Sequence, residues 1–202
     1  MKSFRIFKHG TLTITEVPLT EEEVRECLEL GKKRTEVDEE ELKWWFRHNG
    51  LSSPRAHAIG LMGEIGFEKW LNSKGLKRNV DYVRGKTLVR TYAEIEQDFT
   101  IWNKAVGVKS ADNNNLEDAT KFGTFLYPAK IMPEEAIRVL PYPKYLVQTV
   151  VSTNKKTCWL CGYVDEETIK ASSIAEIHRK PTHRIAIEKY GPVDELLKKI
   201  KT

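Results

Sequence analysis

The segment from Ser53 to Gly75 restricts the possible folds more than any other part of the sequence. Ser53 is a favoured helix N-cap, Pro54 suits the first helical position, and Gly75 suits the end of a helix. Between them, apolar residues recur at the three- and four-residue spacing of a buried helix face: Ile59, Met62, Phe67 and Trp70. Glycines at positions 60, 63 and 66 each cost roughly 1 kcal/mol of helix propensity. We therefore expect this helix to lie very close to a sheet or a ligand.

Strand and helix signals alternate along the rest of the chain, without a repeat or a Pro/Gly/Ser-rich linker. Residues 4–14 predict an N-terminal β-hairpin, and two helices at about 20–33 and 38–48 are expected to cover the main sheet. Further strands and helices are expected, in chain order, at 145–151, 157–164, 166–173, 184–188 and 192–199. The sequence predicts one α/β domain over 1–202, with residues 1–50 as the cover and a mixed central sheet flanked by helices.

Composition and cysteine usage exclude several classes of protein. With 40% apolar and 31% charged residues the chain can bury a core, which excludes disordered and collagen-like chains. It has no uncharged apolar run of about 18 residues, and its first ten residues are too charged for a signal peptide. Three cysteines, at positions 27, 158 and 161, do not make a disulfide framework. We therefore expect a cytoplasmic protein without membrane contact.

The net charge of +4 is unevenly distributed. Residues 69–130 contain 11 basic and 7 acidic side chains, and residues 144–202 also contain 11 and 7. Such an excess permits a polyanionic partner but does not require one. Glutamate and lysine are abundant, at 22 each, whereas glutamine occurs only twice, which is a usage typical of proteins from hot environments.

The stretch 97–110 predicts a second hairpin that gathers charged groups. If Asn103 and Lys104 form a two-residue turn, Asp98 lies opposite Lys109 on the neighbouring strand. Because side chains alternate along a strand, one face of the hairpin is apolar and contains Phe99, Ile101, Val106 and Val108. The other face contains Asp98, Thr100, Gly107 and Lys109. The charged pair is either a surface ion pair, worth less than about 1 kcal/mol, or part of a site.

The order of these features resembles the core of the restriction-endonuclease-like nucleases, the PD-(D/E)xK superfamily. Glu64 in Gly-Glu-Ile-Gly resembles the helix glutamate of that family, Asp98 in Asp-Phe-Thr-Ile the strand aspartate, and Lys109 in Gly-Val-Lys-Ser the lysine. The resemblance covers about residues 54–190. It implies a restriction-endonuclease-like core and a metal-dependent DNA endonuclease that hydrolyses phosphodiester bonds.

The resemblance also implies the roles of individual residues. Glu64, Asp98 and the backbone carbonyl of Val108 would bind Mg²⁺ or Mn²⁺, and Lys109 would assist the attacking water and the transition state. Where the family has an acidic residue two positions before the lysine, this chain has Gly107. Magnesium tolerates such a loss because it commonly keeps several waters. The alternative is a catalytically inactive nucleic-acid-binding protein on the same fold.

Basic side chains outside this set are candidate contacts to DNA phosphates. They are Lys104, Lys121, Arg179, Lys180 and Arg184. Small nucleases of the superfamily often act as symmetric dimers, so the resemblance also implies a homodimer.

Three weaker signals remain open. Cys158, Cys161, His178 and His183 have a spacing near that of a zinc finger but with a longer central spacer, so a zinc-stabilised module is a third hypothesis. If Cys158 lies in a strand, however, the two cysteines point to opposite faces. His57 can border a site or be a buried structural histidine. Gln148 can reach a substrate or be a polar residue of the sheet face.

Overall fold

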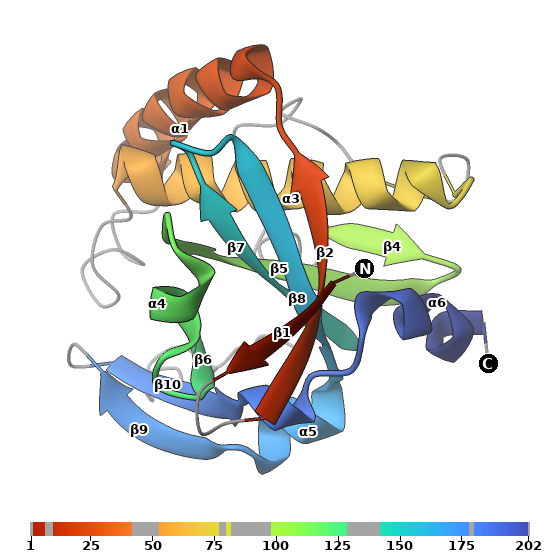
Figure 1. Cartoon of the computed structure of the whole chain (residues 1–202). Helices are drawn as coiled ribbons and strands as arrows, with labels where there is room; N and C mark the ends of the chain where they lie inside the picture. Colours follow the sequence, from red (N-terminus) through yellow and green to blue (C-terminus); the bar gives the residue numbers. More distant parts are fainter. Residues whose placement is uncertain are drawn as a thin grey trace.

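Two β-sheets organise the computed structural model (Figure 1). It describes the backbone of residues 2–6, 10–41, 53–76, 80–81, 98–128, 142–177 and 180–201, and the side chains of 11–36, 53–76, 98–127, 142–177 and 181–201. The central sheet has seven strands in the order β1-β2-β8-β7-β5-β4-β3. Their bounds are β1 Lys2–Ile6, β2 Gly10–Pro18, β3 Val80–Asp81, β4 Phe99–Ile101, β5 Lys104–Asp112, β7 Tyr145–Ser152 and β8 Thr157–Asp165.

The central sheet is mixed, as the sequence predicts. β5 and β7 are parallel, and the other neighbouring strands are antiparallel. The N-terminal hairpin forms as expected from β1 and β2, but β2 also pairs with β8. The hairpin is therefore part of the central sheet, and the expectation that it serves as a cover is wrong.

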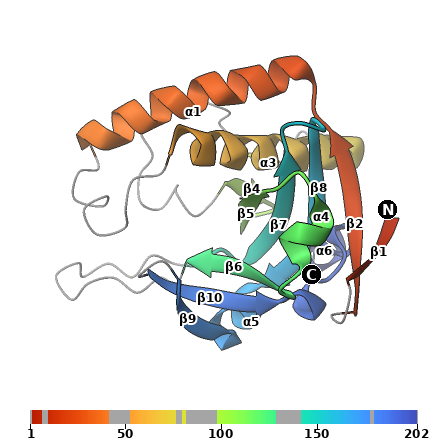
Figure 2. The ribbon, with the colours of Figure 1, turned by 60° about the vertical axis from the view of Figure 1, so that its left-hand side comes forward.

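One face of this sheet is covered by helices (Figure 2). The helix predicted from Pro54 is α3, Pro54–Ser73, and α6, Val193–Lys201, shares its hydrophobic core. The expected pair of N-terminal helices is one helix over the described residues, α1 (Glu21–Glu41), which packs mainly on α3. The chain between the two expected helices has no proline or glycine to end the first, so α1 continues. Residues 42–48 lie outside the described residues.

The other face is covered mainly by a second sheet, which the sequence did not predict (Figure 2). Its strands are β6 Thr124–Pro128, β10 Lys180–Ala186 and β9 Ser173–Ile177, in that order. Two short helices accompany it, α4 Leu116–Thr120 and α5 Glu166–Ala171, and a 3-10 turn, η3 Ile187–Lys189, follows β10. This face is therefore covered by a sheet together with short helices, whereas the sequence predicted only flanking helices.

The close approach predicted for α3 is confirmed. A side-chain carbon added at Gly66 would lie 2.4 Å from the sulfur of Cys158, and one at Gly63 would lie 1.9 Å from the hydroxyl of Ser110. Gly60 has no such neighbour within 4 Å, because that part of the helix borders a cavity. Among the described residues, no helix combines the length and the apolar character needed to cross a membrane.

Candidate active site

The candidate site lies where β4 ends and β5 continues. β4 pairs with β5 only as far as Val106, and no other strand among the described residues pairs with β5 on that side. Asp98 immediately precedes β4, and its carboxylate accepts a hydrogen bond from the backbone N–H of Val108 at 2.6 Å. Because the N–H and C=O of one strand residue point to the same side, the carbonyl of Val108 also faces this open edge.

The turn of the β4–β5 hairpin differs from the prediction. Its two central residues are Trp102 and Asn103, with φ of 45° and 62°, as a type I′ turn requires. The register pairs Phe99 with Val106, so Asp98 falls beside Gly107 and not opposite Lys109. The pairing prediction is wrong because it assumed a turn one residue later. The shift amounts to two residues along one strand, so the predicted division into an apolar and a charged face still holds.

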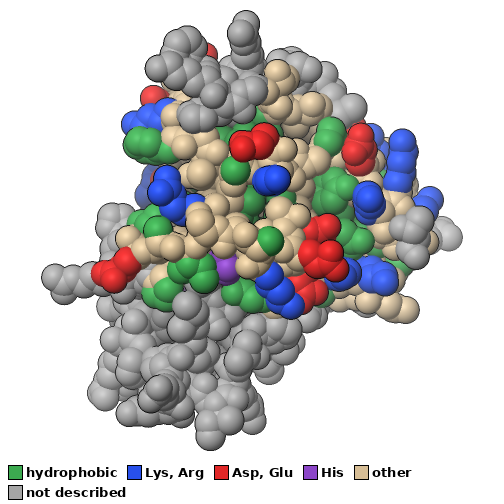
Figure 3. All heavy atoms as spheres, turned by 90° about the horizontal axis from the view of Figure 1, so that it is seen from below, with side chains coloured by type: hydrophobic (Ala, Val, Ile, Leu, Met, Phe, Trp, Pro, Cys, Tyr) green, Lys and Arg blue, Asp and Glu red, His purple; other side chains and the backbone are tan. Residues whose placement is uncertain are grey.

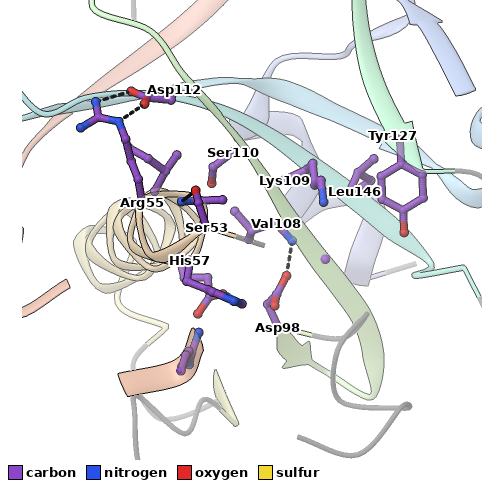
Figure 4. A pocket seen from close by; sticks show the side chains of 16 residues that line it. Ser53, Arg55, His57, Asp98, Val108, Lys109, Ser110, Asp112, Tyr127 and Leu146 are labelled. Carbon is purple, nitrogen blue, oxygen red and sulfur yellow. Dashed lines mark hydrogen bonds and ion pairs between the residues drawn. The ribbon is translucent and has the colours of Figure 1, made fainter. Parts of the chain in front are cut away.

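A pocket of about 540 Å³ lies beside this edge (Figure 4). Its lining includes Glu64 from α3, Asp98 from the start of β4 and Lys109 from β5, so the three residues singled out by the sequence meet at one cavity. In Figure 4, β5 runs between the α3 side of the pocket and the side of the second sheet. Lys109 and Leu146 lie on the latter side, next to Tyr127 of β6.

The acidic groups of the pocket are oxygen donors of the kind that Mg²⁺ binds. Glu64 is buried, with 5% of its surface exposed, and the carboxylate of Asp98 is held by Val108. Over the described side chains, no three His, Cys, Asp or Glu residues are grouped closely enough to hold a metal ion. The available set is therefore two carboxylates, the Val108 carbonyl and water, which fits a hard cation that keeps part of its hydration shell. The side chain of Glu96, a possible substitute for the missing acid at Gly107, lies outside the described residues.

Lys109 is half-buried at the pocket wall. Burial lowers its pKa because the charged ammonium loses hydration, while the negative charge of Asp98 acts in the opposite direction. The phenol of Tyr127 shows the converse effect, since burial and then the charge of Asp98 raise its pKa. The pocket thus combines an ammonium that releases its proton readily with a phenol that stays protonated.

Three further residues of the pocket were not predicted as site residues. Arg55, in the first turn of α3, forms a bidentate ion pair with Asp112 at 2.5 and 3.1 Å. Arg34 lies within α1 and is buried, with 7% exposed. Nothing local in the sequence marks these side chains, because α1, α3 and β5 meet only in the folded chain. His57, which the sequence left open, also lines the pocket.

The predicted phosphate contacts are dispersed over the molecule. Lys104 lies at the hairpin turn, and Lys121 is exposed after α4 with its ammonium 5.1 Å from the ring of Phe122. Arg184 is exposed on β10. The backbone of Lys180 belongs to β10, whereas its side chain and the whole of Arg179 lie outside the described residues.

The zinc hypothesis is not compatible with the positions of the cysteines. Cys158 and Cys161 are both fully buried in β8, but they belong to separate hydrophobic clusters on opposite faces of the sheet. Burial raises the pKa of the Cys158 thiol to about 12, which disfavours the thiolate that zinc needs. His178 lies outside the described residues, and both ring nitrogens of His183 are hydrogen-bonded to Tyr142 and Ser172.

Gln148 lies next to Lys109 in the register of β5 and β7, as the sequence suggested for a neighbouring strand. It is buried, with 2% exposed, and its amide donates to the carbonyl of Thr149. It does not line the pocket, so the interpretation as a polar residue of the sheet face fits better.

Comparisons with protein-family models, with curated proteins and with solved structures gave no significant match to this chain.

Proposed function

We propose that the protein is a metal-dependent endonuclease that hydrolyses phosphodiester bonds of DNA. The single observation that carries the proposal is the meeting of Glu64, Asp98 and Lys109 at one cavity beside the open edge of β5. The order of helix, hairpin and crossover strand resembles the restriction-endonuclease-like core, and this resemblance supports the same assignment. The homodimer implied by that resemblance remains part of the proposal.

Glu64 and Asp98, with the carbonyl of Val108, are the groups that would hold Mg²⁺ or Mn²⁺. When bound, such an ion neutralises charge on the scissile phosphate and makes a coordinated water more acidic. The hydrogen bond from the backbone N–H of Val108 fixes one oxygen of the Asp98 carboxylate. Glu64 is buried in α3 and Asp98 precedes β4, so separate elements position the two carboxylates.

Lys109 would contribute on the other side of the scissile phosphate. Its ammonium can donate hydrogen bonds to phosphate oxygens as their negative charge increases in the transition state. The lowered pKa also allows Lys109 to exchange a proton with water near neutral pH more readily than an exposed lysine. The negative charge of Asp98 counteracts this effect of burial.

The main alternative is a nucleic-acid-binding protein without catalytic activity. Two observations favour it. Gly107 supplies no carboxylate beside Asp98, and no group of three acidic, histidine or cysteine ligands occurs among the described side chains. The two functions differ in one measurable respect, because only the nuclease requires a divalent ion for product formation.

The experiment that tests the proposal is cleavage of supercoiled plasmid and of branched DNA with Mg²⁺, with Mn²⁺ and with chelator. We expect nicked or linear product only with the metal. Asp98→Asn keeps the shape of the side chain and an acceptor for Val108, so it should fold normally while cleavage falls on the order of a hundredfold or more. The exposed Glu22→Gln substitution on α1 is the matched control. Metal-independent cleavage, or full activity in Asp98→Asn, would refute the proposed site.

A further inference from the structure

A second surface of the β4–β5 hairpin lies away from the pocket, at the turn. Trp102, Lys104, Ile200 and Lys201 line an open groove between the hairpin and the last turn of α6, here called the Lys104–Lys201 groove. The ammonium of Lys201 lies 5.1 Å from the centre of the Trp102 ring. Figure 3 shows several basic side chains on this side of the molecule, where Figure 1 draws α6 and the hairpin turn.

The charges of the groove are not neutralised within the described part of the chain. Four other lysines form ion pairs with carboxylates: Lys69, Lys74, Lys156 and Lys170. Neither Lys104 nor Lys201 has a carboxylate within ion-pair distance among the described residues, and no acidic side chain lines the groove. Lys198 adds a further exposed cation in the same turn of α6. A groove that combines unneutralised ammonium groups with an aromatic ring is suited to a chain of phosphates.

The position of the groove fits the same substrate as the pocket. Lys104 and Lys109 lie on one strand, five residues apart, and this spacing corresponds to about 17 Å along β5. The odd spacing turns their side chains to opposite faces of the sheet, but the pocket reaches both faces around the open edge of β5. Phosphates of one DNA strand are about 3.4 Å apart along the helix axis, so the groove lies about five nucleotides from the pocket. Because β5 is a strand of the central sheet, the two contacts keep a fixed separation.

We propose that the Lys104–Lys201 groove binds the phosphate backbone of the DNA substrate about five nucleotides from the scissile phosphate. This inference rests on the proposed nuclease function for the pocket but concerns a separate surface. The groove sets how much duplex must flank the cleavage site on one side.

The test measures binding without cleavage. Fluorescence anisotropy with a labelled duplex of about 20 base pairs, in chelator, compares wild type with the double variant Lys104→Ala/Lys201→Ala at several salt concentrations. We expect the dissociation constant to rise about tenfold. The slope of log affinity against log salt should fall by about 1.8, or about 0.9 for each phosphate that the variant no longer binds.

Lys170→Ala is the matched control, because it removes a cation that also lies over a ring, that of Tyr142, but is neutralised by Glu166. We expect it to bind DNA as wild type does. Shortening the duplex to about 8 base pairs should weaken binding of wild type more than binding of the double variant. Circular dichroism and thermal unfolding confirm that both proteins are folded.

Unchanged affinity and salt slope in the double variant would overturn the inference even if wild type cleaves DNA with metal. Preferential binding of polyglutamate over DNA at the groove would overturn it in favour of an acidic protein partner. Conversely, loss of DNA binding in the double variant together with absence of cleavage by wild type supports the groove and refutes only the nuclease function. The two proposals therefore fail separately.

Discussion

The pocket beside β5 and the cluster of Ser172, His183 and Tyr142 both remove polar side chains from bulk water, but in different ways. In the cluster, Ser172 donates to the carbonyl of Ile169 at 2.7 Å, so its oxygen accepts from Nδ1 of His183 at 2.9 Å. The hydroxyl of Tyr142 then donates to Nε2 at 2.8 Å. This network closes on itself with a neutral imidazole.

In the pocket, by contrast, the charged groups border empty space. Glu64, Asp98 and Lys109 come from three elements and line one cavity. Polar groups that satisfy one another specify the fold, whereas charged groups that line a cavity can contact a ligand that enters it. We therefore expect variants in the pocket to lower activity more than stability, and variants in the cluster to lower stability more than activity.

The largest effect is expected for Lys109→Met. Cleavage should fall by a factor on the order of a thousand, because the variant lacks the group that stabilises developing charge. The free energy of unfolding should stay the same or rise, since methionine fills similar space without a desolvated ammonium. Plasmid cleavage and urea unfolding measure the two effects. Lys155→Met, at an exposed position, is the control, and a loss of stability in Lys109→Met beyond about 2 kcal/mol would contradict the assignment of Lys109 to a ligand site.

The second-largest effect is expected in α3, which packs on the hydrophobic core at Gly66 and borders the pocket at Gly60. Gly66→Ala would place a carbon 2.4 Å from the sulfur of Cys158, and we expect the free energy of unfolding to fall by about 2–3 kcal/mol. Gly60→Ala meets nothing within 4 Å and should raise it by up to about 1 kcal/mol through helix propensity. Urea unfolding of both variants checks the pair. Equal changes in the free energy of unfolding for the two substitutions would contradict the placement of Gly66 against the core and of Gly60 at the cavity.

The parts of the fold that the sequence predicts have local causes. Ser53 caps α3 by accepting from the N–H of Ala56, and Asp165 caps α5 by accepting from Thr168, so both boundaries are visible in a few residues. The close approach of α3 was predictable from the glycines at positions 63 and 66. The faces of the β4–β5 hairpin followed from alternation alone.

The parts that were missed depend on distant contacts. The second sheet joins the consecutive strands β9 and β10 to β6, which lies about fifty residues earlier in the sequence, and none of the three has a long alternating pattern of its own. The register of the hairpin depended on Trp102 adopting a positive φ, which is unusual for a bulky residue. Arg34 and Arg55 reach the pocket only because α1 packs on α3 and α3 on the sheet.

The smallest effect is the pH dependence of the closed cluster. Burial lowers the pKa of His183 below its ordinary value of 6.5, although its hydrogen bond with Ser172 acts in the opposite direction. The unfolded chain therefore takes up a proton at higher pH than the folded one. The contribution of His183 to stability should be constant above about pH 6.5 and decrease below it, by at most about 1.4 kcal/mol per pH unit.

The carboxylates whose pKa values are lowered, Glu23 and Asp165, reduce stability only below their ordinary values of 4.5 and 3.8. The window between about pH 6.5 and 5 therefore separates the histidine contribution from theirs. Urea unfolding at about pH 7.5 and about pH 5.5, for wild type and for His183→Gln, isolates it by difference. A smaller loss in the variant supports a neutral, fully bonded His183. An equal loss would show that His183 accepts a proton without cost, and the contrast between closed cluster and open pocket would then no longer hold.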